Sequence, residues 1–139
     1  MSTRSIIATV NKDDKIESIY CHFDGYPDGV GYVLRRYYNN DFMIGCLMEL
    51  GNISTLDEFC IPVGNTHSFD TPEIGVSVAY GRDRGESGQE SKIWDSIQDW
   101  LGGTQKDNSF IDYAYLWDGE EWCGWNCFTQ EPVDWSKYE

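Results

Sequence analysis

Basic residues are scarce in this chain of 139 residues, which has 10 lysine and arginine residues against 24 aspartate and glutamate residues. The formal net charge at pH 7 is −14. Such a surface repels nucleic acid and anionic membranes at physiological salt. The charge therefore argues against direct nucleic-acid binding and favours a basic partner, although an acidic surface can also serve solubility alone.

Long apolar runs and complete catalytic motifs are also missing. No run of about 18 apolar residues could span a membrane, and the first residues, Met1 to Arg4, start no signal peptide. These two absences predict a cytoplasmic protein. A nucleophile elbow, a Walker A loop, a dinucleotide fingerprint and an HExxH motif are all absent. The sequence is therefore more typical of a binding protein than of an enzyme, and it indicates no cofactor.

The cysteines are five in number. An odd count without a secretion signal argues against a disulfide framework, so we expect reduced thiols that pack as small hydrophobic residues. Cys123 and Cys127 have a spacing that could bind zinc together with two further ligands from elsewhere in the chain. That spacing lies inside a predicted strand and no second cysteine pair exists, so we predict no metal site.

Apolar residues are sufficient for a single domain over residues 1–139. They make up 40% of the chain and include 6 Trp, 9 Tyr and 6 Phe, so a core can form. Alternating patterns predict one hairpin near the N-terminus and a second around an Asp-Gly turn. The predicted strands of the two hairpins cover residues 4–11, 16–22, 111–117 and 121–128. Residues 129–139 are a candidate tail, pinned by Trp135.

Helices are predicted between the two hairpins. One apolar stripe predicts a helix from Val30 to Tyr37, and a second short helix runs from Phe42 to Leu50. A strand is expected over 75–80. A capping box at 87–90 opens a further helix that ends at Gly102-Gly103. This order predicts an α+β fold, in which an antiparallel β-sheet carries two or three helices on one face.

The loop after the second strand is the first candidate ligand site. His22, Asp24 and Tyr26 bring an imidazole, a carboxylate and a phenol to the end of a predicted strand. His22 could act as a base or a ligand, with Asp24 fixing its tautomer. The alternative is structural: Asp24 caps backbone donors of a turn while His22 is half buried.

A glycine-bounded loop after the 75–80 strand is the second candidate ligand site. Arg82 and Arg84 could form a fork for a carboxylate or phosphate, and Glu86 stands beside them. The alternative is a local salt-bridge loop, whose exposed pairs contribute about 0–1 kcal/mol each. If this loop meets the first one across a pocket, the two would hold a nucleotide or another phosphate compound.

Acidic residues are densest in residues 105–139 and on the predicted helix from Gln89 to Leu101. A basic surface that itself binds nucleic acid would complement them. The candidate partner-binding residues are Asp95, Asp99, Asp118, Glu120 and Glu121.

Two strings in the sequence are specific: Ile19-Tyr20-Cys21-His22-Phe23-Asp24-Gly25-Tyr26-Pro27 and Ala79-Tyr80-Gly81-Arg82-Asp83-Arg84-Gly85-Glu86. They resemble a family of small uncharacterised proteins from bacteriophages and prophages. With weaker stretches, the resemblance covers most of residues 5–122. It implies a mobile-element accessory protein. Small acidic proteins of this kind often counter host defence by mimicking DNA, blocking an effector or sequestering a nucleotide signal.

Three functional hypotheses follow. The leading one is a stoichiometric counter-defence inhibitor in the host cytoplasm that binds a basic surface of a host immune protein. The second is a protein that binds or sequesters a nucleotide-type small molecule through the two candidate loops. The third is a small-molecule enzyme with His22 as base or Cys21 as nucleophile. The oligomeric state stays open, with a homo-oligomer as one option.

Overall fold

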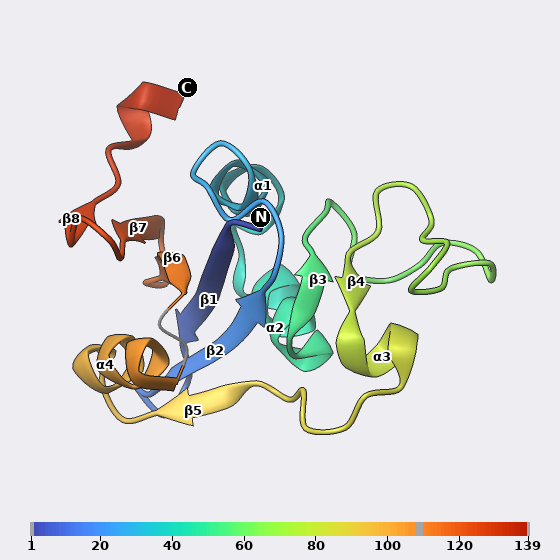
Figure 1. Cartoon of the computed structure of the whole chain (residues 1–139), viewed down its shortest axis with the longest axis horizontal. Helices are drawn as coiled ribbons and strands as arrows, with labels where there is room; N and C mark the ends of the chain where they lie inside the picture. The colour runs from blue at the N-terminus through green and yellow to red at the C-terminus, as the bar shows by residue number, and fades with distance from the viewer. Residues whose placement is uncertain (1, 108–109, 139) are drawn as a thin grey trace.

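The computed structural model of the chain describes residues 2–107 and 110–138 and has a β-sheet at its centre (Figure 1). The described strands are β1 Arg4–Val10, β2 Ile16–Cys21, β3 Ile53–Thr55, β4 Val78–Ala79, β5 Lys92–Trp94, β6 Ile111–Trp117, β7 Trp122–Asn126 and β8 Glu131–Pro132. The described helices are α1 Val30–Tyr37, α2 Asp41–Leu50, α3 Tyr80–Arg84, α4 Ile97–Asp107 and the 3-10 helix η1 Trp135–Tyr138. The strands follow the order β4-β3-β2-β1-β6-β7-β8, and β5 pairs with β2 outside this row. The α+β class expected from the sequence is confirmed.

The two predicted hairpins form the middle of the sheet. β1 pairs with β2 and β6 with β7, both antiparallel. Side chains fix the two turns: Asn11 Oδ1 accepts two turn amides at 2.9 and 3.0 Å, and Asp118 Oδ1 accepts two at 2.8 Å. Such turns set the register of a hairpin. The sheet as a whole is mixed, because β1 pairs with β6 and β2 with β3 in parallel.

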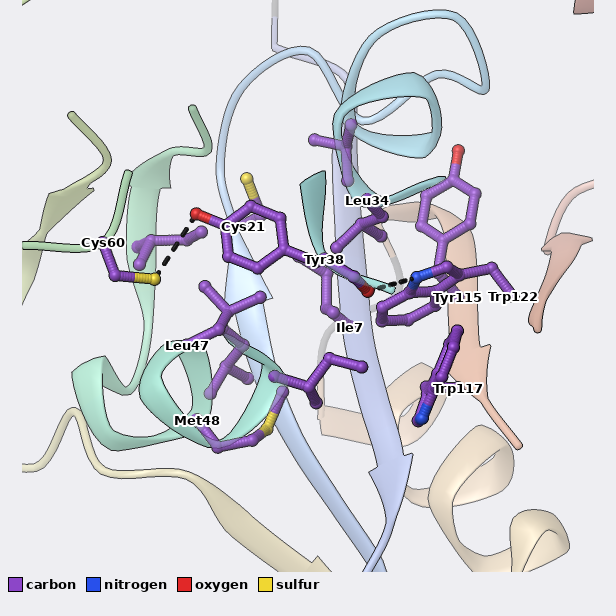
Figure 2. Close-up of a cluster of buried hydrophobic side chains, with 14 of the residues drawn as sticks. Ile7, Cys21, Leu34, Tyr38, Leu47, Met48, Cys60, Tyr115, Trp117 and Trp122 are labelled. Carbon is purple, nitrogen blue, oxygen red and sulfur yellow. Dashed lines mark hydrogen bonds between the residues drawn. The ribbon is translucent and has the colours of Figure 1, made fainter. Parts of the chain in front are cut away.

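Both faces of the central strands are buried. Side chains alternate along β1, so Ile7 joins an apolar cluster with α1 and α2, while Ile6 and Ala8 join a second cluster with α4. Two helices therefore cover one face, and α4 covers the other. Figure 2 shows the first cluster around Tyr38, which is fully buried and whose carbonyl accepts the indole N–H of Trp122 at 2.8 Å.

The helix expected after the capping box at 87–90 begins and ends later than predicted. The residues of β5 pair with β2 instead, and Trp94 donates its Nε1–H to Ser18 Oγ at 3.0 Å. The helix α4 then passes through Gly102 and Gly103 without stopping. Gly103 serves packing, because an added Cβ would lie 2.2 Å from the Trp94 ring. The predicted start and stop were wrong because strand pairing and ring packing outweighed local helix signals.

Two shorter segments also differ from the prediction. The strand expected over 75–80 is reduced to β4, and Tyr80 already begins α3. The first part of the glycine-bounded loop expected after this strand is therefore helical. This short helix is stabilised by Asp83, whose Oδ2 accepts the Ala79 amide at 2.8 Å.

The C-terminal segment is held against the sheet. β8 pairs with β7, and Trp135 donates its Nε1–H to the carbonyl of Trp122 at 3.0 Å. The Trp135 ring also stacks on Tyr115, with ring centroids 6.0 Å apart. Trp135 therefore anchors the segment expected as a tail, which carries β8 and η1. None of the helices that the structure describes is long and apolar enough to cross a membrane.

Candidate functional site

The polar residues of the first predicted loop form hydrogen bonds with one another and with nearby residues. His22 Nδ1 lies 2.7 Å from the hydroxyl of Tyr20, and burial together with the positive charge of Arg4 lowers the pKa of His22. Tyr26 donates its hydroxyl to Asp24 Oδ1 at 3.0 Å. Asp24 has a left-handed φ of 58°, and its carbonyl accepts the amide that opens α1 at 2.8 Å. These contacts support the structural interpretation, in which Asp24 caps a backbone donor of the turn and His22 is half buried.

The cysteines offer neither an activated nucleophile nor a metal cluster in the described structure. Cys21 is fully buried, and burial raises the pKa of its thiol to about 12. A thiol with so high a pKa carries almost no nucleophilic thiolate at pH 7. Cys123 is exposed on β7, where partial burial raises its pKa. In residues 2–107 and 110–138 no group of three or more His, Cys, Asp or Glu side chains could hold a metal ion.

The two arginines of the second predicted loop point to different partners instead of forming a fork. Arg82 donates to the carbonyl of Cys60, to the carbonyl of Ser77 at 2.9 Å and to the carboxylate of Asp83. Arg84 pairs with the carboxylate of Glu86. Its guanidinium carbon also lies 4.3 Å from the centre of the Phe69 ring and 5.1 Å from that of Tyr80.

The two predicted loops lie on opposite sides of β3. The amide of His22 donates to the carbonyl of Ile53 at 3.1 Å, and the amide of Tyr80 donates to the carbonyl of Asn52 at 3.2 Å. Across the described residues, no hydrogen bond, ion pair or ring contact joins His22, Asp24 or Tyr26 to Arg82, Arg84 or Glu86. The structure therefore brings the residues together within each loop but not between the loops.

His67, which the sequence offered only as one of several possible zinc ligands, connects the second loop to the long 56–77 segment. His67 Nε2 lies 3.0 Å from Asp83 Oδ2, and the two side chains are only 3% and 5% exposed. His67 Nδ1 accepts the amide of Glu73 at 3.0 Å, which places the ring proton on Nε2. Both ring nitrogens are therefore occupied, and His67 has no nitrogen left to act as a base.

Asp83 is the centre of this buried network. Burial by itself would raise the pKa of Asp83, but hydrogen bonds from Arg82, from the Ala79 amide and from His67 outweigh it and lower the pKa. The side chains of the His67–Asp83–Arg82 network thus hold the 56–77 segment against α3. The contact of His67 with Asp83 was not predicted, because an isolated histidine in a polar stretch carries no periodic signal.

A cleft of about 450 Å³ lies beside this network, between α2 and the 86–90 segment. Arg82 and Glu86 line it together with Glu49 and Glu90. The donors of Arg82 are engaged by the network, and the remaining charged groups are carboxylates. This cleft therefore disfavours a phosphate or another anionic ligand.

The acidic residues predicted to bind a partner converge at one end of the sheet. Thr9 lies opposite Trp117, Val10 opposite Ile16, and Ile16 opposite Trp94. The chain segments that follow these positions therefore leave the sheet at the same end. We call this surface the acidic end and define it as residues 11–15, 95–99 and 118–121, which together carry seven carboxylates and two lysines.

All five predicted partner-binding residues belong to the acidic end. Asp95 pairs with Lys15 at 2.8 Å and is still 79% exposed. Asp99 lies in the first turn of α4 beside Asp95, and both line a shallow hollow of about 500 Å³. Asp118 accepts the amides of the β6–β7 turn, which lowers its pKa. The acidic end is thus an exposed and negatively charged surface.

No protein-family model matches this chain, and neither a curated protein nor a solved structure matches it.

Proposed function

We propose that this protein is a stoichiometric inhibitor that binds a basic, nucleic-acid-binding surface of a partner protein through the acidic end. The observation that supports this proposal is the strand register, which gathers Asp95, Asp99, Asp118, Glu120 and Glu121 at one end of the sheet. A dense array of carboxylates on a rigid scaffold attracts a basic surface and raises the rate of association. It would occupy the surface that the partner otherwise offers to nucleic acid.

The resemblance to bacteriophage proteins suggests the kind of partner. A mobile-element accessory protein with this surface would act in the host cell against an immune protein that binds DNA or RNA. One copy would block one nucleic-acid site, because docking, and not turnover, produces the effect. The two candidate loops support ligand binding less well, since their polar groups are engaged with one another or with the backbone.

The test compares two triple charge reversals of equal net charge. Asp118→Lys, Glu120→Lys and Glu121→Lys together remove the negative charge of one turn in the acidic end. The control reverses exposed carboxylates elsewhere, at Asp28, Asp70 and Glu131. Asp28 lies in the loop after β2 and Glu131 is the first residue of β8, both at the opposite end of the sheet.

Each protein is immobilised and exposed to a bacterial lysate treated with nuclease. Captured nucleic-acid-binding proteins are then purified and assayed for displacement of their DNA or RNA by added protein. We expect one-to-one displacement by the wild type and the control, a loss with the acidic-end variant, and weaker binding as salt increases. Equal displacement by both variants, or displacement that does not depend on salt, would refute the proposal.

A further inference from the structure

A cleft with mixed lining adjoins the acidic end on the α2 side of the sheet. It has a volume of about 550 Å³ and lies between the β1–β2 turn and α2. Its apolar lining includes Val10, Ile44 and Met48, and the last two are only 1% and 3% exposed. Its acidic lining includes Asp13 and Asp41, which are exposed. The cleft therefore has an apolar floor beneath a negatively charged rim.

Gly45 forms part of the wall of this cleft, and the fold gives no reason for a glycine there. It lies in the middle of α2, where glycine destabilises a helix relative to alanine. A Cβ added at Gly45 would meet nothing within 4 Å, whereas one added at Gly103 would collide with a tryptophan ring. Gly45 is also exposed. A glycine of this kind suits a place where another molecule approaches the helix backbone closely.

Two carboxylates of the cleft are held in position by neighbouring side chains. Asp41 Oδ1 accepts the indole N–H of Trp117 at 3.1 Å, and Glu17 Oε2 accepts the hydroxyl of Ser91 at 2.6 Å. Each carboxylate keeps further lone pairs for a second donor. Lys12 is the one basic side chain among the described residues of this lining. The charge of the cleft is therefore negative and complements a cation.

We infer that this cleft receives an arginine or lysine side chain of the basic partner protein. The aliphatic stem of such a side chain packs on Ile44 and Met48 and passes Gly45, while its cationic head reaches Asp13 and Asp41. A small anion or a wholly apolar group would fit only half of this lining. The inference rests on the proposed function, because it names the group of the partner that the α2 side of the acidic end binds.

The test titrates the isotope-labelled full chain with Nα-acetyl-arginine amide and follows backbone amide shifts by NMR. The neutral isostere Nα-acetyl-citrulline amide is the ligand control. Gly45→Leu fills the cleft from the helix. Gly102→Leu is the matched protein control, because Gly102 also lies in a helix with open space at its Cβ but outside this cleft.

We expect the arginine compound to shift amides of residues 10–17 and 41–48, and the citrulline compound not to. Gly45→Leu should weaken binding by about tenfold or more, while Gly102→Leu and the Asp118, Glu120 and Glu121 reversal leave it unchanged. Gly45→Ala should raise the melting temperature, since alanine is the better helix former.

Several outcomes would overturn the inference. Equal shifts with citrulline, unchanged binding to Gly45→Leu, or shifts confined to residues 95–99 and 118–121 would each show that the cleft does not select a cationic side chain. The last of these would leave the proposed function standing. A lower melting temperature for Gly45→Ala would show that the glycine has a structural purpose. Failure of the displacement assay alone would refute the proposed function and leave arginine binding in the cleft as an independent result.

Discussion

Asp83→Asn should destabilise the protein far more than its position in a charged loop suggests. Asp83 accepts hydrogen bonds from His67 at 3.0 Å, from the Ala79 amide at 2.8 Å and from Arg82 at 2.8 Å. Asparagine keeps the shape but has one acceptor oxygen and no charge. At least one buried donor is then unpaired, at about 1–3 kcal/mol, and a charged pair is lost as well. We expect the free energy of unfolding to fall by about 3 kcal/mol.

The assay is urea unfolding at pH 7, followed by tryptophan fluorescence. Glu86→Gln is the matched control, because it breaks the neighbouring pair of Arg84 and Glu86, whose side chains are 49% and 36% exposed. An exposed pair of this kind contributes about 0–1 kcal/mol. A loss for Asp83→Asn no greater than that for Glu86→Gln would show that the buried network does not stabilise the fold.

The ionisation of Asp83 also predicts how the stability of the protein changes at low pH. The pKa of Asp83 in the folded protein is lowered, so the unfolded chain binds the proton more readily. The stabilisation is complete above the unfolded pKa of about 3.9 and is lost as the pH falls through the lower folded value. The difference in unfolding free energy between wild type and Asp83→Asn should therefore be constant near neutral pH and shrink below about pH 4. If the difference in unfolding free energy stayed constant down to the pH at which the protein unfolds in acid, the lowered pKa of Asp83 would be contradicted.

Three further predictions concern packing and thiol reactivity. Gly103→Ala should destabilise the protein by about 1–3 kcal/mol, because the added Cβ meets a tryptophan ring. Gly102→Ala should stabilise it by up to about 1 kcal/mol, because its Cβ meets open space and alanine is the better helix former. Both are measured by urea unfolding, and changes of the same sign in the two variants would contradict this packing. Trp135→Ala should cost about 2–4 kcal/mol in the same assay through lost stacking and a lost hydrogen bond. Maleimide labelling followed by peptide mass spectrometry should modify exposed Cys123 first and buried Cys21 only on unfolding; rapid labelling of Cys21 would contradict its burial.

Local sequence patterns predicted the helices and strands that depend mainly on residues near one another in the chain. Both hairpins and the first two helices form where alternation, turn residues and apolar stripes indicate them. The parallel pairing of β1 with β6 joins segments about a hundred residues apart, and no local pattern encodes such a contact. The displaced start of α4 has the same origin, because β2 recruits Trp94 into a strand before the helix begins. Gly102-Gly103 resembles a helix stop in sequence, yet Gly103 accommodates that tryptophan ring.

The candidate ligand loops were recognisable as loops, but their chemistry depended on neighbours that the sequence does not place. Whether the guanidinium of Arg82 is available to a ligand is decided by the carbonyls of Cys60 and Ser77, which lie outside this loop and accept hydrogen bonds from it. Whether His67 is free or buried is decided in the same way by Asp83. A polar residue in a loop therefore indicates a site only after its partners in the fold are known.

The acidic residues differ from these loops in one physical respect. A carboxylate on a turn after a strand end has few neighbouring groups to contact, so its exposure to solvent can be expected from its position in a hairpin. What the sequence could not provide was their convergence, which depends on Trp117 lying opposite Thr9 and Trp94 opposite Ile16. A shift of one residue in either pairing would move these turns relative to each other and turn side chains to the other face of the sheet. The proposed partner surface is therefore a property of the sheet register, and a variant that changes that register should lose binding even with every carboxylate retained.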